Sequence, residues 1–288
     1  MKKIALMPNE HKDKGLLCAR EVAKKILSLD KSILVPCEYA EYFSDIPEVI
    51  LMSECELFEN AELAVVTGGD GSIIHTARMA ALSSVPIIGV NLGRLGYLAE
   101  LELDETDMLA EVFEGRYSLE KRMMLEYEIV KKDGSTEIGD PALNDIVLTS
   151  RGNTNRVVDI EIYADEHKNP VGAFRGDGVI ASTPTGSTAY SLAAGGPVVD
   201  PALECINIVP ICTHSLMARP MLFSAGTVLK LVNAGRVVIN VSADGSDEYK
   251  IEPGEYVRIK RSEYTAHFVR IRNSSFYEVL RNKMAENR

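Results

Sequence analysis

Apolar runs alternate with amphipathic segments through the first 120 residues, and this pattern constrains the fold more than any other feature. Strands are predicted at 2–8, 32–36, 61–67 and 85–91, and helices at 13–28, 72–83 and 104–115. Strands that alternate with helices form βαβ units, in which a helix returns the chain to a parallel neighbouring strand. We therefore expect an α/β domain with a parallel, Rossmann-like sheet.

The pattern changes to antiparallel β signals near residues 118–122. The segment RVVDIEIYAD alternates with period two, an Asp-Gly pair follows EIVKK, and 227–262 is typical of strand, turn, strand, turn, strand. After residue 266 the pattern is mixed and ends in a predicted helix at 274–286. Because 288 residues exceed most single domains, we expect two domains.

Charge and composition limit the classes of molecule that the protein is expected to bind. The chain is 46% hydrophobic and 25% charged, with a net charge of −11, a composition typical of globular proteins. The acidic balance argues against nucleic acid as the main partner, because neutralising phosphates requires a basic face. An anionic small molecule stays compatible, since backbone amides and a few arginines can hold one.

The cysteines are five in number and widely scattered, at 18, 37, 55, 205 and 212. This pattern predicts a reducing cytoplasm, no disulfide framework and no zinc site. The first apolar run is too short for a signal peptide, and no run approaches a membrane span. We therefore expect a cytoplasmic protein with no membrane partner.

A glycine-rich loop lies between a strand and a helix in AVVTGGDGSIIHTARMA, residues 64–80. Glycines allow a tight turn and bring N–H groups close to a ligand, and the next helix directs its positive end to the same place. Phosphate is the expected occupant. Yet the loop has no lysine to offset charge, matches neither common phosphate-binding pattern, and carries Asp70.

Two interpretations of Asp70 stay open. It caps the helix at 72–83, or it accepts the proton of a bound hydroxyl, which gives a carboxylate beside phosphates a use. His75 and Arg78 lie one turn apart on that helix. We interpret His75 as an ordinary half-buried histidine.

Two further loops are candidates for ligand binding. NLGRLGYL, 91–98, follows a strand and is either a connecting loop or part of the ligand side of a doubly wound sheet. The stretch 174–201 contains a predicted helix at 187–194. Hydroxyls crowd its start, at Thr183, Thr185, Ser187, Thr188 and Tyr190. Singly these are caps or core residues, but together with flanking glycines they favour a site that bonds ribose or phosphate.

Three weaker signals follow. Asn144 and Asp145 begin a strand, so both reach one ligand only where the chain bends; an Asx turn is the alternative. SADGSDE, 242–248, is interpreted as a hairpin turn, with a ligand role for Asp244 or Ser246 as the minority interpretation. His214 has apolar neighbours, which favours core packing or an interface over catalysis.

Together these motifs resemble those of the NAD kinases. TGGDGS, GVNLGRLGYL, LNDIVL, RGDGVIASTPTGSTAYSLAAGGP, HSLMARPMLF and SADGS occur in the family's order between about residues 60 and 250. The TPTGSTAYSL segment is highly specific, whereas GGDG also occurs in phosphofructokinases and lipid kinases. The resemblance implies a phosphate-donor domain (1–120), a β-sandwich-like NAD-binding domain (121–265) and a tail (266–288) that packs back on the first.

The resemblance also implies an activity, namely Mg²⁺-dependent transfer of a phosphoryl group from ATP, or in some members polyphosphate, to the 2′-hydroxyl of the adenosine ribose of NAD. The site would lie between the domains and be completed by a neighbouring subunit in a homodimer or homotetramer. Asp70 would accept the proton, and the donor loop would comprise Gly68, Gly69, Gly71 and Ser72. NAD would contact Asp70, Gly71, Asn144, Asp145, Arg156, Arg175, Asp177, Thr185, Thr188, Ala189, Tyr190, Ser191, Leu192, Ala193 and Ser246.

Two positions depart from the family. Asp145 replaces the usual Glu and is one methylene shorter, and Ala193 stands where several members carry a serine.

Two alternative functions stay open beside this one. A lipid kinase needs an apolar or basic membrane-facing surface, which the sequence lacks. A non-catalytic NAD(P) sensor needs no proton acceptor, so the intact Asp70 argues against it.

Overall fold

The computed structural model describes the chain except residues 94–95, 151–155, 214–217, 247–248, 273–274 and 287–288. The chain forms two compact units. The first comprises Met1–Lys121 and Ala266–Arg288, and the second comprises Arg122–Thr265. Since the long strands β7 (Ser118–Val130) and β18 (Tyr256–Arg270) cross the boundaries, each unit contains part of both.

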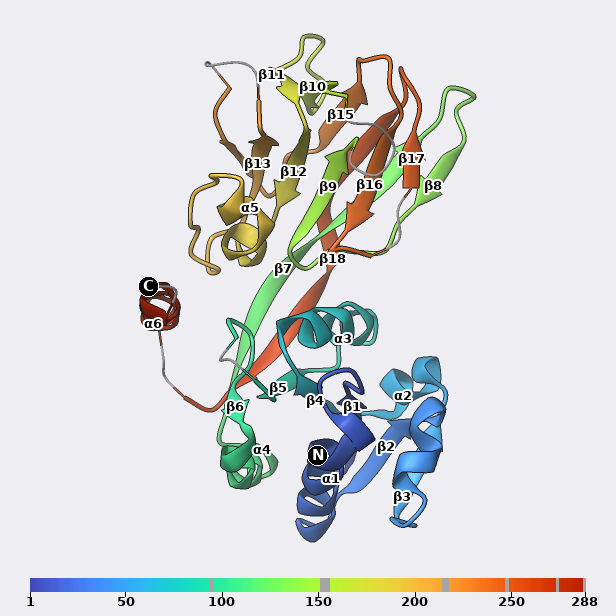
Figure 1. Ribbon diagram of the computed structural model, residues 1–288, viewed down its shortest axis with the longest axis vertical. Coiled ribbons are helices and arrows are strands. Elements are labelled where there is room, and N and C mark those ends of the chain that lie inside the picture. Colours follow the sequence, from blue (N-terminus) through green and yellow to red (C-terminus); the bar gives the residue numbers. More distant parts are fainter. Residues whose placement is uncertain (94–95, 151–155, 214–217, 247–248, 273–274, 287–288) are drawn as a thin grey trace. The chain divides into compact units, whose positions relative to one another are not determined.

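The first unit contains a parallel sheet with strand order β3-β2-β1-β4-β5. Its strands are β1 (Lys3–Pro8), β2 (Ser32–Pro36), β3 (Val49–Met52), β4 (Leu63–Gly68) and β5 (Ile87–Asn91), with a short β6 (Leu101–Glu102) beside β5. At the edge next to β5, Phe268 of β18 continues the sheet in parallel with Ile87. The predicted parallel α/β architecture is confirmed (Figure 1).

Helical segments connect these strands. They are η1 (Lys14–Leu16), α1 (Leu17–Ser28), η2 (Cys37–Phe43), α2 (Glu54–Asn60), α3 (Asp70–Leu82), η3 (Leu103–Met108), α4 (Leu109–Phe113) and, near the C-terminus, α6 (Phe276–Glu286). The helix expected at 13–28 is broken at its start, because Gly15 and Leu16 adopt φ angles of 71° and 51°. The helix expected at 104–115 divides into η3 and α4.

The strand order places a topological switch between β1 and β4. The chain passes from β1 outward to β2 and β3, then returns to the other side of β1 as β4. In parallel α/β sheets, ligands bind outside the carboxyl ends of the strands at such a point. The loops after β1 and β4 therefore flank the expected position of a ligand.

The second unit is a sandwich of two antiparallel sheets, as the resemblance implied. One sheet has the order β11-β10-β15-β18, with β7 beside β18 and β8 beside β7, and the other has the order β14-β13-β12-β9-β16-β17. The remaining bounds are β8 (Thr136–Ile138), β9 (Asp145–Thr149), β10 (Val158–Ala164), β11 (Gly172–Gly176), β12 (Gly178–Ser182), β13 (Cys205–Ile211), β14 (Met221–Ser224), β15 (Leu229–Asn233), β16 (Ile239–Ala243) and β17 (Tyr249–Ile251).

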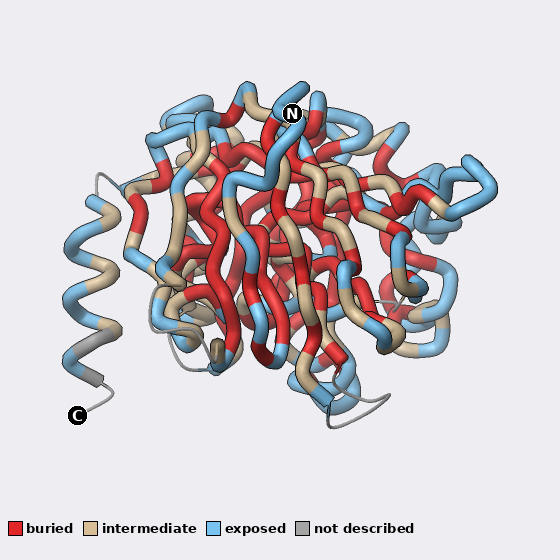
Figure 2. Tube along the Cα trace, turned by 90° about the horizontal axis from the view of Figure 1, so that it is seen from above, coloured by how far each residue is buried: buried red, intermediate tan, exposed pale blue. Residues whose placement is uncertain are grey.

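Alternating burial forms the core of this sandwich. Along β10 every second residue is buried, and side chains of both sheets meet in one cluster that includes Ile160, Leu231, Val179 and Val241. Figure 2 shows the buried positions running along the strands. The region 227–262 was expected to be successive hairpins, but β15 and β16 belong to different sheets.

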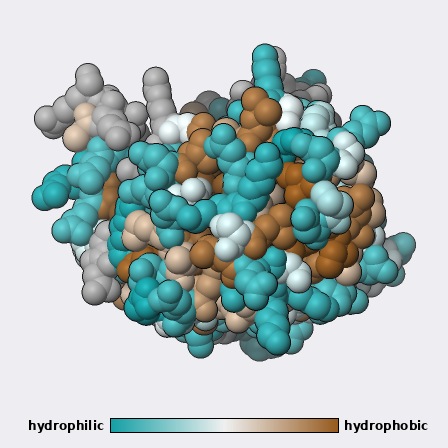
Figure 3. Space-filling model, turned by 90° about the horizontal axis from the view of Figure 1, so that it is seen from below, coloured by the Kyte–Doolittle hydropathy of each residue, from teal (hydrophilic) through white to brown (hydrophobic). Residues whose placement is uncertain are grey.

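Surface hydropathy is mixed on the face drawn in Figure 3, where hydrophilic residues separate the hydrophobic ones. Among the described residues, none of the helices has both the length and the apolar character needed to span a bilayer.

Candidate active site

Asp70 lies in the first turn of α3, directly after the glycine loop. Gly69 is the N-cap residue, with no side-chain cap, and the helix begins at Asp70 itself rather than at residue 72. The interpretation that Asp70 merely caps a helix at 72–83 is therefore wrong.

The carboxylate of Asp70 is held by the loop that follows β5. The backbone N–H of Tyr97 donates to Oδ2 at 2.9 Å, and the N–H of Leu98 donates to Oδ1 at 3.2 Å. Gly96 packs against the carboxylate so closely that a Cβ there would lie 1.9 Å from Oδ1. The second glycine cluster is thus part of the Asp70 site and not only a connection.

The glycines of the first loop differ in their surroundings. A Cβ on Gly68 would lie 2.6 Å from the hydroxyl of Ser72, whereas a Cβ on Gly71 would meet nothing within 4 Å. The backbone at Gly71 is therefore open to a ligand at the N-terminus of a 13-residue helix, where an anion is favoured. The amide of Asn9 donates to the Ser72 hydroxyl and joins the loop after β1 to α3.

Lys12 is a basic residue near this loop that sequence analysis missed. A Cβ on Gly69 would lie 2.3 Å from its Nζ, so an ammonium group stands beside a loop that has no lysine of its own. Residues that follow β1 and β4 meet at the same edge of a parallel sheet. Lys12 could therefore be found only with the strand order in hand, which the motif does not contain.

A cavity of about 330 Å³ opens at this edge of the first unit. Asn9 from the loop after β1 and Gly71 and Ser72 of α3 line part of it, together with carboxylates that include Glu54. His75 also lines the cavity, and its side chain is 65% exposed, with Nε2 4.0 Å from Glu54. The prediction of a half-buried histidine is therefore wrong.

In the second unit, Asn144 and Asp145 stand at the start of β9, where Asp244 holds their backbone. Asp244 Oδ2 accepts the N–H of Leu143 at 2.7 Å, and Oδ1 accepts those of Asn144 and Asp145 at 2.8 and 3.0 Å. Asp244 sits at φ 51° in the turn between β16 and β17. The predicted hairpin turn is confirmed, and its carboxylate is directed into the protein.

The hydroxyl-rich segment packs directly on this strand start. Thr183 donates its N–H to the carbonyl of Asn144 at 2.8 Å and its hydroxyl to that of Leu143 at 2.6 Å. Gly186 lies so close that a Cβ would be 2.1 Å from the Asn144 carbonyl. The structure thus brings Asn144, Asp145 and the 183–188 segment together.

Most hydroxyls of this segment are turned inward, contrary to the expected polar surface. Ser187 bonds to the backbone of Val199, and Ser191 accepts from Asn207; both serines are completely buried. Thr185, which is also buried, accepts from Arg122 at 3.2 Å. The hydroxyls of these residues shape the loop, and Arg122 is a further buried neighbour that sequence reasoning missed.

The helix expected at 187–194 is two short pieces. A 3-10 helix, η4 (Thr185–Thr188), ends at Ala189, whose ψ of −129° breaks the helix before α5 (Tyr190–Ala193). Thr188 donates to the carbonyl of Thr185. Tyr190 and Ala193 are exposed and Thr188, Ala189 and Leu192 are half-buried, so this is the accessible part of the segment.

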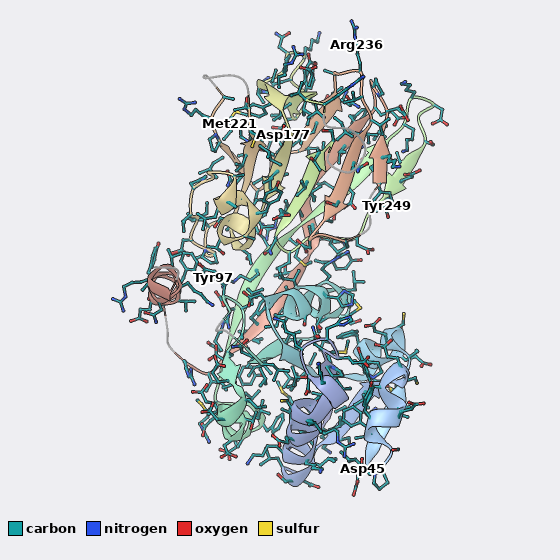
Figure 4. All side chains as sticks on the ribbon, viewed as in Figure 1. Asp45, Tyr97, Asp177, Met221, Arg236 and Tyr249 are labelled. Carbon is teal, nitrogen blue, oxygen red and sulfur yellow. The ribbon has the colours of Figure 1, made fainter. Side chains whose placement is uncertain are left out.

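Arg156, Arg175 and Asp177 lie elsewhere, near the start of β10 and the point where β11 leads into β12. All three are exposed, and Arg175 faces Asp159 at 3.6 Å. Asp177 precedes β12, whereas α5 follows its other end (Figures 1 and 4). Five strand residues span about 16 Å, so within one unit these residues do not lie with Asn144.

Ser246 and His214 are the last two residues to which the sequence analysis assigned a role. Ser246 lies in the turn after Asp244 and donates its hydroxyl to the carbonyl of Ala243 at 2.6 Å. His214 lies outside the described residues.

The pKa of Asp145 differs strongly from that of a free aspartate. Its burial, together with the negative charge of Asp244, raises the pKa of the Asp145 carboxyl from 3.8 to about 7. A buried carboxyl with a perturbed pKa beside an accessible loop is typical of functional sites.

Comparison with known proteins identifies the family. Two family models match, the ATP-NAD kinase N-terminal domain over residues 15–117 and the ATP-NAD kinase C-terminal domain over residues 143–271. The chain belongs to the NAD kinase family. Members named NAD kinase from Thermoanaerobacter sp. (strain X514) and Symbiobacterium thermophilum are 37% and 39% identical, over 99% of this chain and 100% and 99% of theirs.

Solved structures of the NAD kinase family share the fold. Yeast NADH kinase complexed with NADH superposes with a TM-score of 0.90 at 24% identity, over 99% of this chain and 88% of that one. The NAD kinase from Archaeoglobus fulgidus in complex with ATP gives 0.73 at 26% identity, over 98% of each chain. Membership of the NAD kinase family makes this chain a phosphotransferase with an alcohol group as acceptor, which replaces the lipid-kinase and sensor alternatives.

Proposed function

We propose that this chain transfers a phosphoryl group from ATP to the 2′-hydroxyl of the adenosine ribose of NAD, giving NADP, and that Asp70 accepts the proton. The observation that supports this role is the environment of the Asp70 carboxylate. Each oxygen accepts one backbone N–H, and since a carboxylate has about four acceptor positions, about two are left for a substrate hydroxyl.

The donor site of the proposal is the glycine loop of the first unit. The open backbone at Gly71, the N-terminus of α3 and the ammonium of Lys12 near Gly69 together favour phosphates. Relatives support the choice of donor, because the Archaeoglobus fulgidus NAD kinase was solved with ATP.

We propose that Mg²⁺ enters this phosphate-binding site together with ATP, as an ion bound to the phosphates of the nucleotide. The described residues contain no group of three or more His, Cys, Asp or Glu side chains able to hold a metal, and Mg²⁺ is commonly bound by substrate phosphates, waters and one or two carboxylates. Asp70 is a carboxylate adjoining the loop, and Glu54 lines the cavity beside it. When bound, the ion neutralises charge on the phosphates.

In the reaction, the 2′-oxygen of NAD forms a bond to the transferred phosphorus as the bond to the ADP oxygen breaks. Asp70 takes the hydroxyl proton as this bond forms, because an alcohol is too weak an acid to ionise beforehand. Such general-base assistance contributes about 10²–10⁴-fold. Positioning by the loop amides supplies a further part of the rate.

NAD is proposed to contact the accessible part of the 144–193 cluster, namely Asn144, Thr188, Ala189, Tyr190, Leu192 and Ala193, together with the carboxyl of the buried Asp145 beside Asn144. Arg156, Arg175 and Asp177 stand at the opposite end of β12. We propose that these three act on NAD held by a second copy of the chain, in a homodimer or homotetramer.

The catalytic role is tested with Asp70→Asn. We expect NAD binding, measured by calorimetry, to be retained and NADP formation from NAD, ATP and Mg²⁺ to fall about 10²–10⁴-fold. Asp45→Asn, which changes a surface carboxylate of the same unit, is the matched control and keeps full turnover. Full turnover of Asp70→Asn would remove the proposed role; runs with polyphosphate and with NADH define the donor and acceptor.

Whether two copies of the chain share one NAD site is tested by mixing two variants, each of which we expect to be inactive alone. If Asp70 and Asp177 of different copies serve one NAD, co-refolded Asp70→Asn and Asp177→Ala chains regain activity, because some sites receive both intact residues. A mixture no more active than the sum of its components would contradict the shared site.

A further inference from the structure

The position of the Asp70 carboxylate is set by one short loop. Tyr97 and Leu98 donate their N–H groups to its two oxygens, and Gly96 makes room for the carboxylate, since a Cβ there would lie 1.9 Å from Oδ1. Tyr97 can be located in Figure 4. Any displacement of Leu98 is therefore transmitted to the carboxylate.

The same loop is fixed from its other side by the end of β18. Arg270 donates through Nη1 to the carbonyl of Leu98 at 3.0 Å and to Glu100 Oε2 at 3.2 Å, and through Nε to Glu120 at 2.7 Å. The side chains of Arg270 and Glu100 are 16% and 4% exposed. One planar guanidinium thus joins the loop carbonyl to two carboxylates.

Glu100 closes this arrangement with its other oxygen. Oε1 accepts the N–H groups of Ile271 and Arg272, both at 2.9 Å. The carboxylate therefore bonds the chain on both sides of the end of β18, and its ion pair with Arg270 is well shielded from solvent. A shielded, multiply bonded pair is rigid, since loss of any one bond leaves a polar group without its partner.

We propose that Arg270 and Glu100 are positioning residues for the Asp70 carboxylate, acting through the backbone of Leu98. This inference rests on the proposed role of Asp70 as proton acceptor. The decisive feature is that Leu98 uses its N–H for Asp70 and its C=O for Arg270. The returning C-terminal segment, about 170 residues distant in sequence from the loop, thereby orients the reacting group.

Arg270→Lys is the first test. Lysine keeps the positive charge opposite Glu100 but cannot bond three acceptors with a planar fork. Because a displacement of about 1 Å can lower a rate about 100-fold, we expect kcat to fall about 10- to 100-fold, with KM for NAD and ATP changed less than about threefold.

Arg20→Lys is the matched control. Arg20 also bonds one carbonyl, that of Tyr42, and one carboxylate, that of Asp45, within the same unit, and these guanidinium bonds do not involve the loop at 96–98. We expect its kcat to be unchanged. Glu100→Gln provides a second variant at the same network, which keeps an acceptor for the two N–H groups, and we expect kcat to fall as in Arg270→Lys.

A double-mutant cycle separates positioning from general destabilisation. If Arg270 acts through Asp70, Arg270→Lys lowers kcat less than about twofold in an Asp70→Asn enzyme, because the carboxylate that Arg270 orients has already been replaced by an amide. Equal losses in both backgrounds, or unchanged kcat in both Arg270→Lys and Glu100→Gln, would overturn the inference. Full turnover of Asp70→Asn alone would instead refute the proposed function.

Discussion

Replacing Asp145 by asparagine is expected to stabilise the protein at alkaline pH. Asp145 is buried at the start of β9, and its burial and the charge of Asp244 raise the pKa of its carboxyl from 3.8 to about 7. Between these two values the folded chain keeps a proton that the unfolded chain has released. Stability therefore falls as the pH rises through this window and levels off above about pH 7.

The magnitude follows from the two pKa values. One pKa unit corresponds to about 1.4 kcal/mol, so the raised pKa of Asp145 lowers the free energy of unfolding, relative to its value at low pH, by about 2 kcal/mol at pH 5 and about 4 kcal/mol at pH 8. Asparagine has nearly the same shape and no charge. The stability of Asp145→Asn relative to wild type should thus rise by about 2–3 kcal/mol between pH 5 and pH 8.

The assay is urea unfolding of both proteins at the two pH values and equal ionic strength. Titration of the groups that do not interact with Asp145 is common to both proteins and cancels in the difference. A relative change below about 1 kcal/mol, or one of opposite sign, would refute the reasoning. If the proposed NAD contact also holds, the same variant has a raised KM for NAD, since a group kept at a cost to stability is typical of a binding site.

Three further predictions concern the second unit, which also contains Asp145. Gly186→Ala should lower the free energy of unfolding by about 1–3 kcal/mol in urea titrations, because its Cβ would lie 2.1 Å from the carbonyl of Asn144. Asp244→Ala should lower it by at least about 3 kcal/mol, since three N–H groups of residues 143–145 lose their acceptor, and Asp244→Asn should lose less. Tyr190→Ala, at an exposed ring, should raise KM for NAD about tenfold in steady-state assays while stability changes less than about 1 kcal/mol.

Sequence pattern predicted the central strands of the first unit because they are uniformly apolar and bounded by turns. It missed β3, where Ile50 and Leu51 are both 42% exposed. A four-residue edge strand with exposed central residues has neither the alternation of a half-buried strand nor the continuous burial of a central one. The neighbouring η2 and α2 were missed as well, because they are too short to show a clear period.

The motifs located the candidate site but not the direction of its side chains. In the hydroxyl-rich segment, irregular backbone directs Thr183 and Ser187 inward and leaves Tyr190 exposed. Period-based reasoning has no rule for such a segment, because neither a period of 2 nor one of 3.6 applies. Lys12 and Arg270 escaped notice for a different reason, since both reach the Asp70 region only through strand order, which no local pattern records.

The two Asp-Gly motifs hold their carboxylates in different ways, and the difference bears on the proposed role of Asp70. Asp244 accepts three backbone N–H groups, which occupy most of about four acceptor positions. Asp70 accepts two, one on each oxygen, so each oxygen keeps capacity for a hydroxyl. The sequence around both residues is Asp-Gly-Ser. What distinguishes them is the number of amides that neighbouring segments bring to each carboxylate, and the less occupied carboxylate of Asp70 suits the proposed role of proton acceptor better.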